Sequence, residues 1–397
     1  MPSFFENEVI SINRELSDEV REIDHDEINE KYTKGDVRIV TEQGRFQLTT
    51  VPSIVESSDY ILDPEFQRRH RWSEEKKSRL IESFIMNVPI PPIFLYEIDF
   101  SVYEVMDGLQ RLTALTEFYN DKFELDGLEE WRELNGLRYS QLPTQIKRGI
   151  DRRYLSSMIL LKETAKSEEE AQRLKQLVFE RINSGGEQLE EQEKRNALYN
   201  GKLNKLCIRL SRNSFFCKMW GIPTQTQEEL EGNLPKELTE NTLFRKMYDV
   251  ELVLRFFAFR HIEQWDRLIL KRFLDLFLQE GNLLGDEVLE NYRELFEETS
   301  EFVYNLLDEE AFCLYRVRNG KWAVYNRPTK VVFDPLMYVL SNYLEHKETL
   351  LDKSEEIRVD ILEFYKENYE QFGGRNTGKQ EVLSRIELFD AFFKKYL

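Results

Sequence analysis

One stretch of the sequence, residues 102–118 (VYEVMDGLQRLTALTEF), constrains the fold more than any other. Its first part is rich in β-branched and aromatic residues and predicts a strand, which Asp107 and Gly108 end. After this pair, apolar residues recur every three positions, close to the helical repeat: Leu109, Leu112, Leu115 and Phe118. The stretch therefore predicts a strand, a two-residue turn and a helix with one buried stripe.

The predicted turn has the chemistry of an anion site. The first turn of a helix carries backbone N–H groups without helical partners and the positive end of its dipole. Arg111 adds a planar guanidinium suited to phosphate, and Gln110 adds an amide that donates and accepts. Asp107 has three open roles: capping the helix, holding a metal ion or orienting water. A simple turn and helix cap is the alternative for the same residues.

Several further motifs follow in order along the chain. They are FQRRHRW at 66–72, LIES at 80–83, PIPPIF at 89–94, DGLQR at 107–111, INSGG at 182–186 and LVLRFFAF at 252–259. Together they resemble the D-G-Q-Q-R family of bacterial domains, which includes the GmrS half of the GmrSD restriction enzyme and the N-terminal part of SspE. A combination of motifs is far more specific than any one of them.

The resemblance implies a ParB/sulfiredoxin-like fold, nucleotide binding and hydrolysis at the D-G-Q-Q-R motif, and a role in defence against foreign DNA. Leu109 departs from the first Gln of that motif, so no role that needs this amide is carried over. We expect the chain to bind a nucleoside triphosphate with Mg²⁺ and to hydrolyse it. The expected catalytic residues are Asp107, Gln110 and Arg111, with Asp107 as the metal ligand.

Residues outside the turn are also expected to contact the nucleotide. Arg68 matches the Arg of the family's F-Q-R and precedes a predicted helix that Ser73 caps. The INSGG motif offers backbone N–H groups ahead of a helix that carries Glu193 and Asn196, although a helix-linking turn is the alternative. The expected nucleotide-binding residues are Arg68, Gly108, Arg111, Asn183, Ser184 and Gly185.

Charge sets limits on nucleic-acid binding. The 55 Lys and Arg against 74 Asp and Glu give a net charge of −19, which argues against coating DNA by global charge. Residues 138–162 carry six basic residues against one acidic, so this run is either a solvated face or a local DNA contact. The DNA-binding candidates are Arg148, Arg152 and Arg153.

Other features predict a cytoplasmic protein without disulfide bonds or a structural zinc site. Cys207, Cys217 and Cys313 are odd in number and lack C-x-x-C spacing, so neither disulfides nor a zinc site is expected. No stretch approaches the roughly 18–20 apolar residues of a membrane span. Residues 373–380 (GGRNTGKQ) nearly match a phosphate loop, but Gln380 lacks the hydroxyl for magnesium and a helix precedes it.

We expect an α+β chain of three parts. Residues 1–35 are an acidic extension outside the core. Strands at 37–41 and 45–51, with a turn at 42–44, begin a small mixed-sheet ParB/sulfiredoxin-like domain, residues 36–165, which a strand at 154–161 closes. Residues 166–397 are mainly α-helical, with a hairpin around Asn319 and Gly320.

The expected function is a nucleotide-binding, NTP-hydrolysing component of bacterial defence against phage or modified DNA. It acts with, or as, a DNA-restriction component. The chain shows no His-Asn-His nuclease module, so any cutting of DNA comes from the D-G-x-Q-R turn or from a partner nuclease. The alternative is a non-catalytic DNA-sensing or adaptor module that recruits a separate nuclease, and a homo-oligomer is compatible with both.

Overall fold

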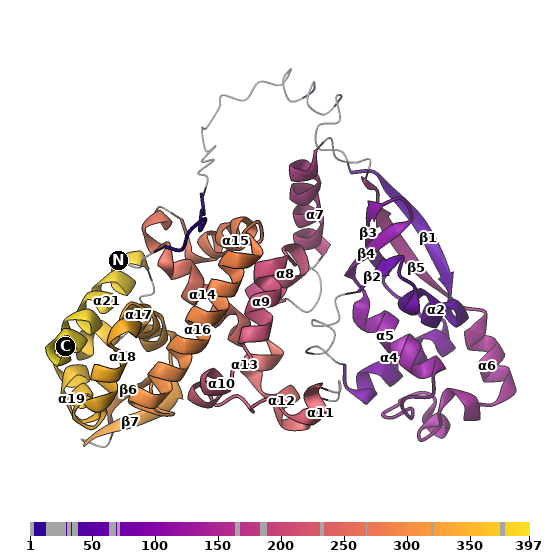
Figure 1. Ribbon diagram of the computed structural model, residues 1–397. Helices are drawn as coiled ribbons and strands as arrows, with labels where there is room; N and C mark the ends of the chain where they lie inside the picture. Colours follow the sequence, from indigo (N-terminus) through magenta and orange to yellow (C-terminus); the bar gives the residue numbers. More distant parts are fainter. Residues whose placement is uncertain are drawn as a thin grey trace. The chain divides into compact units, whose positions relative to one another are not determined.

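The computed structural model divides the chain into two units (Figure 1). Residues 16–189 form the sheet unit, and residues 1–15 with 190–397 form the helical unit. The described residues are 4–12, 29, 33, 39–62, 69, 72–162, 167–182, 189–230, 234–266, 268–318, 321–373 and 378–397. This division differs from the expected boundaries at 35 and 165. Within the described residues no helix combines the length and the apolar character needed to cross a bilayer.

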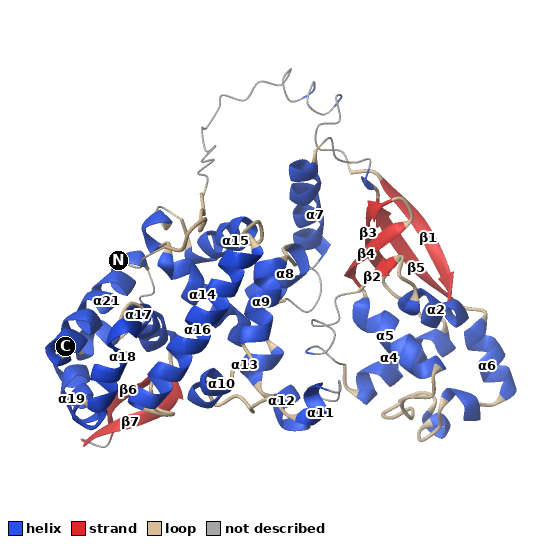
Figure 2. Cartoon of the chain, in the orientation of Figure 1, coloured by secondary structure: helices blue, strands red, loops and turns tan. Residues whose placement is uncertain are grey.

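The sheet unit contains a five-stranded mixed sheet of order β1-β5-β3-β4-β2 (Figure 2). Its strands are β1 (Thr41–Gln47), β2 (Tyr60–Ile61), β3 (Ile93–Asp99), β4 (Val102–Asp107) and β5 (Tyr154–Leu160). Its helices are α2 (Val51–Glu56), α4 (Glu74–Met86), α5 (Leu109–Tyr119), α6 (Thr144–Asp151) and α7 (Glu168–Ile182). The central strand β3 pairs antiparallel with β4 and parallel with β5. The expected α+β class is confirmed.

The first strand differs from the sequence prediction. Instead of two strands around a turn at 42–44, a single strand, β1, runs through that turn, and residues 37 and 38 lie outside the described part. Gly44 stays within the strand opposite Ser157, where a Cβ would lie only 2.6 Å from the Ser157 hydroxyl oxygen. Gly44 was expected to mark a turn, but the close approach of the partner strand explains why a glycine is needed here.

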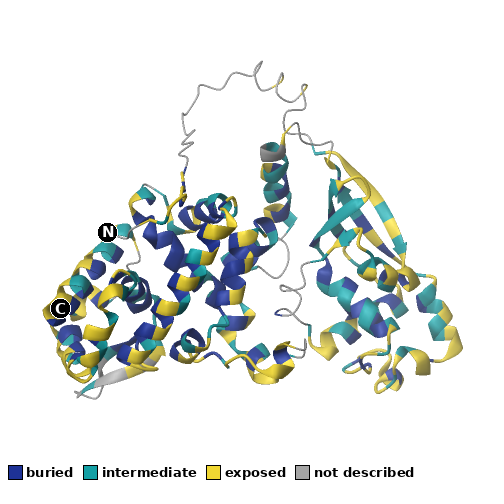
Figure 3. Cartoon of the chain, in the orientation of Figure 1, coloured by how far each residue is buried: buried dark blue, intermediate teal, exposed yellow. Residues whose placement is uncertain are grey.

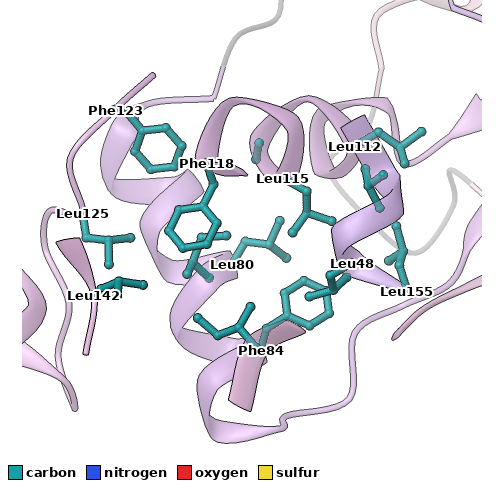
Figure 4. Close-up of a cluster of buried hydrophobic side chains, with 14 of the residues drawn as sticks. Leu48, Leu80, Phe84, Leu112, Leu115, Phe118, Phe123, Leu125, Leu142 and Leu155 are labelled. Carbon is teal, nitrogen blue, oxygen red and sulfur yellow. The ribbon is translucent and has the colours of Figure 1, made fainter. Parts of the chain in front are cut away.

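The core of the sheet unit is a cluster of buried side chains from the sheet and from helices that include α2, α4 and α5 (Figure 4). Leu112, Leu115 and Phe118 of α5 are fully buried, which confirms the predicted stripe. Leu80 and Phe84 of α4 pack in the same cluster. Burial of each such side chain stabilises the unit by about 1.5–3 kcal/mol, so this packing fixes α5 against the sheet.

The helical unit is built around α14 (Tyr248–Arg260), which is buried along most of its length (Figure 3). Its other elements, in chain order, are α8 (Glu191–Leu198), α9 (Lys202–Leu210), α10 (Ser214–Trp220), α11 (Gln227–Leu230), α12 (Lys236–Glu240), α13 (Thr242–Arg245), α15 (Leu270–Gly281), α16 (Asp286–Leu307), β6 (Cys313–Arg318), β7 (Lys321–Pro328), α17 (Lys330–Ser341), α18 (Lys347–Asp352), α19 (Ser354–Glu367), α20 (Tyr369–Phe372) and α21 (Lys379–Phe393). Strands β6 and β7 pair antiparallel, as the hairpin prediction requires.

Residues 4–12 pack within the helical unit, so the expectation of an extension outside the core is wrong for this segment. The Glu8 side chain is fully buried, and its carboxylate accepts hydrogen bonds from Arg260 (2.8 and 3.1 Å) and Tyr292 (2.8 Å). His261 Nε2 lies 2.9 Å from the same carboxylate. Burial alone would raise the Glu8 pKa, but the His261 and Arg260 hydrogen bonds outweigh burial and lower the pKa to about 2. An acidic residue therefore anchors the segment.

Candidate nucleotide-binding site

The D-G-x-Q-R turn lies at a strand–helix junction, as predicted. β4 ends at Asp107, α5 begins at Leu109, and Gly108 between them is buried with φ of +99°. A Cβ on Gly108 would lie 2.3 Å from Cγ2 of Ile93, so both the backbone conformation and the close approach of β3 require glycine. The residue at the cap position of α5 is Gly108, which has no side chain, and the Asp107 carboxylate pairs with Arg111.

Arg111 joins three parts of this junction. Its Nη2 donates a 2.5 Å hydrogen bond to Oδ2 of Asp107, and the two side chains are 11% and 36% exposed for Arg111 and Asp107 respectively. Its Nη1 donates to the carbonyl oxygens of Pro91 and, at 3.3 Å, of Pro92. These contacts use three of the five N–H donors of a guanidinium. Arg111 thus holds the PIPPIF motif against the turn and keeps donors for an anion.

Gln110 connects the turn to the FQRRHRW motif. Its side-chain carbonyl oxygen accepts a 3.1 Å hydrogen bond from the backbone N–H of Trp72, the last residue of that motif. Ser73 then caps α4 through a hydrogen bond from the Lys76 N–H, as predicted. Trp72, Pro91 and Pro92, which belong to two motifs that are separate in the sequence, therefore contact the side chains of the 107–111 turn at the start of α5.

A comparison with known families gave one match. Residues 51–200 match the N-terminal domain of the GmrSD restriction endonuclease. The resemblance seen in the sequence is confirmed over this stretch, which starts at α2 and ends just after α8. Neither the search of curated proteins nor the search of solved structures gave a match.

Some of the predicted nucleotide-binding residues lie outside the described part of the chain, namely Arg68, Asn183, Ser184 and Gly185. The helix after INSGG is α8. The Glu193 carboxylate accepts a hydrogen bond from the backbone N–H of Glu190 and so closes a capping box. Asn196 is fully buried, and its side-chain oxygen accepts a 2.7 Å hydrogen bond from Asn204 of α9. These two residues stabilise the start of the helical unit.

The basic run at residues 138–162 covers α6 and β5. Arg148 and Arg152 are exposed, whereas Arg153 is partly buried next to β5. Arg138 pairs with Glu124 at 3.3 Å and Lys162 with Asp99 at 3.4 Å, so acidic residues from outside the run reduce its local charge. A DNA contact there stays a prediction, with Arg148 and Arg152 as its accessible members.

One ion pair beside the motif strand was not predicted from the sequence. Lys175 of α7 is buried and donates a 2.6 Å hydrogen bond to Glu104 of β4, three residues before Asp107. Its ammonium lies 5.7 Å from the ring centroid of Tyr96 on β3. Burial, followed by the Glu104 charge, raises the Tyr96 pKa. The pair fastens α7 to the strand that carries the motif. From the sequence alone, a lysine in an amphipathic helix is expected to be solvated, and only the position of the sheet shows that Lys175 is buried.

Proposed function

We propose that the sheet unit binds a nucleoside triphosphate at the D-G-x-Q-R turn and hydrolyses it within a restriction-type defence against foreign DNA. The observation that carries the proposal is Gly108 at the start of α5, where three motif segments meet and no side chain occupies the cap. First-turn N–H groups of a helix have no helical acceptors and bind phosphate oxygens well. The match to a restriction endonuclease domain supports the defence context.

The proposed reaction transfers the terminal phosphoryl group to water and yields a nucleoside diphosphate and inorganic phosphate. Gly108 lets phosphate approach the backbone, and the remaining donors of Arg111 neutralise charge on the transferred group. The amide nitrogen of Gln110 orients the attacking water or a phosphate oxygen, since its carbonyl oxygen is already used by Trp72. Arg68, Asn183, Ser184 and Gly185 remain proposed nucleotide contacts.

The residues of the turn fit a magnesium ion that is bound together with the nucleotide. Among the described residues, no group of three or more His, Cys, Asp or Glu side chains could hold a metal. Mg²⁺ in phosphoryl-transfer sites is commonly held by one or two carboxylates and by substrate phosphates, so Asp107 alone suffices on the protein side. The Asp107 carboxylate would hold the ion, and the ion would supply positive charge that offsets charge on the phosphates.

Phosphate release with each of the four ribonucleoside triphosphates and Mg²⁺ tests the proposal. We expect turnover by the wild type and its loss in Arg111→Ala and Asp107→Ala. Arg79→Ala is the matched control, because Arg79 forms an exposed i, i+4 pair with Glu75 on the neighbouring helix α4. Equal release by all four proteins contradicts the proposal, and thermal unfolding curves separate lost activity from lost fold.

One observation favours a second candidate, a non-catalytic adaptor that recruits a separate nuclease. Asp107 and Arg111 bind each other, and Arg111 also binds the Pro91 and Pro92 carbonyls, which is what a purely structural turn requires. Tight nucleotide binding without phosphate release, together with copurification of a nuclease, supports this adaptor. Turnover that depends on Arg111 excludes it.

A further inference from the structure

A cavity of about 580 Å³ lies within the helical unit, between the C-terminal end of α16, the start of β6 and α19 (Figure 1). We call it the α16–α19 cavity. Its volume is within the range of about 300–1,000 Å³ that is typical of small-ligand sites. Leu307, Ala311 and Ile361 are buried and line it with apolar atoms. The α16–α19 cavity therefore has the size and the apolar walls of a ligand site.

The buried side of this cavity carries a hydroxyl group without a partner. Tyr365 of α19 is 2% exposed, and its hydroxyl makes no hydrogen bond with any described residue. Burial raises the pKa of this phenol, so the hydroxyl is protonated at neutral pH and is able to donate and to accept. The Tyr315 ring of β6 stacks on it, with centroids 5.7 Å apart. A buried hydroxyl without a partner costs free energy, so a ligand that supplies the partner is favoured.

Three consecutive carboxylates, Asp308, Glu309 and Glu310, form an exposed acidic rim of the cavity. Asp308 Oδ1 accepts a 2.9 Å hydrogen bond from the Glu309 N–H and so holds the turn after α16. The Glu309 and Glu310 carboxylates have no ion-pair partner among the described residues. Burial, followed by the Glu310 charge, raises the pKa of Cys313 to about 11 and also raises that of Tyr315. The Glu310 charge therefore acts on the buried side of the cavity as well as on its rim.

Arg358 is the one basic residue among the described residues that line the cavity, and its guanidinium is already bound. Its Nε donates a 2.8 Å hydrogen bond to the Leu306 carbonyl, and its Nη2 donates a 2.9 Å hydrogen bond to the Asn305 carbonyl. These carbonyls lie at the C-terminal end of α16, where the helix dipole favours a cation. One bound guanidinium against three carboxylates leaves a lining that repels anions and attracts cations.

We propose that the α16–α19 cavity binds an ammonium or guanidinium group on an aliphatic stem, as in a lysine or arginine side chain or in a small polyamine. The cation would pair with the Glu310 carboxylate and donate a hydrogen bond to the Tyr365 hydroxyl oxygen. The stem would lie against the apolar walls, and the stacked rings of Tyr315 and Tyr365 would attract the cation. The inference goes beyond the proposed function, because this cavity belongs to the helical unit alone and needs no nucleotide.

Ligand-observed NMR of the full chain, without nucleotide, tests the inference with three probes. They are N-acetyl-lysine methylamide, 1,4-diaminobutane and N-acetyl-norleucine methylamide, which keeps the stem but lacks the charge. We expect the two cations to bind, and the norleucine probe to bind at least about tenfold more weakly. Glu310→Gln should weaken both cations about tenfold. Tyr365→Phe should weaken them about fivefold without loss of thermal stability, because its hydroxyl has no partner to lose.

The matched control is Glu287→Gln, which removes the same charge from an exposed side chain in the first turn of α16 and should leave binding unchanged. Equal weakening by Glu287→Gln and Glu310→Gln overturns the inference, since it marks a general attraction of cations to a chain of net charge −19. Equal binding of the norleucine probe also overturns it. Should Tyr365→Phe misfold, Glu309→Gln tests the acidic rim instead and should also weaken both cations.

The two cationic probes distinguish the sources of the ligand. Tighter binding of the diamine assigns the cavity to free polyamines, whereas tighter binding of the capped lysine assigns it to a side chain of a partner protein. Phosphate release is measured on the same variants. Its absence from every protein contradicts the hydrolysis proposal and leaves the cavity unaffected, because the probes bind without nucleotide.

Discussion

The carboxylate of Asp107 accepts a 2.5 Å hydrogen bond from Arg111 and so ties the last residue of β4 to the first turn of α5. The same guanidinium binds the carbonyls of Pro91 and Pro92, just ahead of β3. One side chain thus joins the end of β4, the segment just ahead of β3 and the start of α5.

Arg111→Lys tests whether this geometry, rather than charge alone, is needed. A lysine ammonium is a compact charge that lacks the planar fork spanning Asp107 and the Pro91 and Pro92 carbonyls. We expect phosphate release to fall at least about tenfold, with a weaker effect on unfolding temperature. Arg79→Lys in the exposed pair with Glu75 is the control and should be silent. If Arg111→Lys turns over nucleotide as fast as the wild type, Arg111 contributes only its positive charge and its planar geometry is not needed.

Comparing Gly108→Ala with Gly136→Ala separates the cost of a steric clash from the cost of a positive φ. Both Gly108 and Gly136 have positive φ, +99° and +83° respectively. A Cβ added to Gly108 would clash with Ile93, whereas a Cβ added to Gly136 would have no atom within 4 Å. Gly136→Ala should cost about 1 kcal/mol through φ alone. Gly108→Ala should cost about 3 kcal/mol or more, because Ile93 is fully buried and cannot yield. Urea unfolding of the sheet unit measures both, and equal costs contradict the steric argument.

Gln110→Glu distinguishes the two ends of the Gln110 amide. The carboxylate still accepts the Trp72 N–H, so Trp72 should keep its place. It cannot donate, and it repels phosphate, so nucleotide affinity should fall about tenfold or more while stability is unchanged. Gln110→Ala loses both functions. If Gln110→Glu binds nucleotide as the wild type does, the side chain serves only to hold Trp72.

Glu8→Gln should destabilise the helical unit by about 3 kcal/mol, because it leaves buried Arg260 without its counter-charge. Glu6→Gln is the matched control, since Glu6 lies in the same segment and is exposed. Chemical unfolding followed by tryptophan fluorescence measures the difference. Equal effects of the two substitutions would mean that the buried Glu8 carboxylate stabilises the unit no more than an exposed one.

The same carboxylate predicts a dependence on pH. The Glu8 pKa is lowered from 4.5 to about 2, so the folded state binds this proton less readily than the unfolded chain. Its contribution is fully present above about pH 4.5 and is lost as pH falls toward 2. Glu251, with its pKa also near 2 beside Lys330 and Arg195, acts in the same window. The stability of Glu8→Gln should therefore fall less steeply than that of the wild type between pH 4.5 and 2.

Local sequence predicts local structure well in this chain. The strand, the glycine turn and the stripe of α5 follow from periodicity, because Leu112, Leu115 and Phe118 repeat at helical spacing. The burial of Glu8 does not follow, because its partners Arg260 and Tyr292 lie more than 250 residues away. Gly44 was misread for the same reason, since only the opposing Ser157 explains it.

The site was predicted as a set of residues but not as a set of contacts. Asp107, Gly108, Gln110 and Arg111 do come together at one junction. The use of Arg111 to hold the Pro91 and Pro92 carbonyls, and of Gln110 to hold Trp72, depends on how β3 and α4 approach the turn. Local sequence patterns do not predict how these elements pack against the turn, so the contacts are known only from the folded structure.

The anchoring of Glu8 by Arg260 also bears on how the chain is made. Residues 16–189 lie between two segments of one unit, so a ribosome delivers the first segment long before its partners. Sheet-unit contacts are available as soon as residue 189 has emerged, whereas residues 4–12 wait for a further stretch that includes α14 and α16. Throughout that interval Phe4 and Phe5 lack the ring contacts that they later make with His261 and Tyr292. These two rings can therefore make their contacts only after synthesis has passed Tyr292.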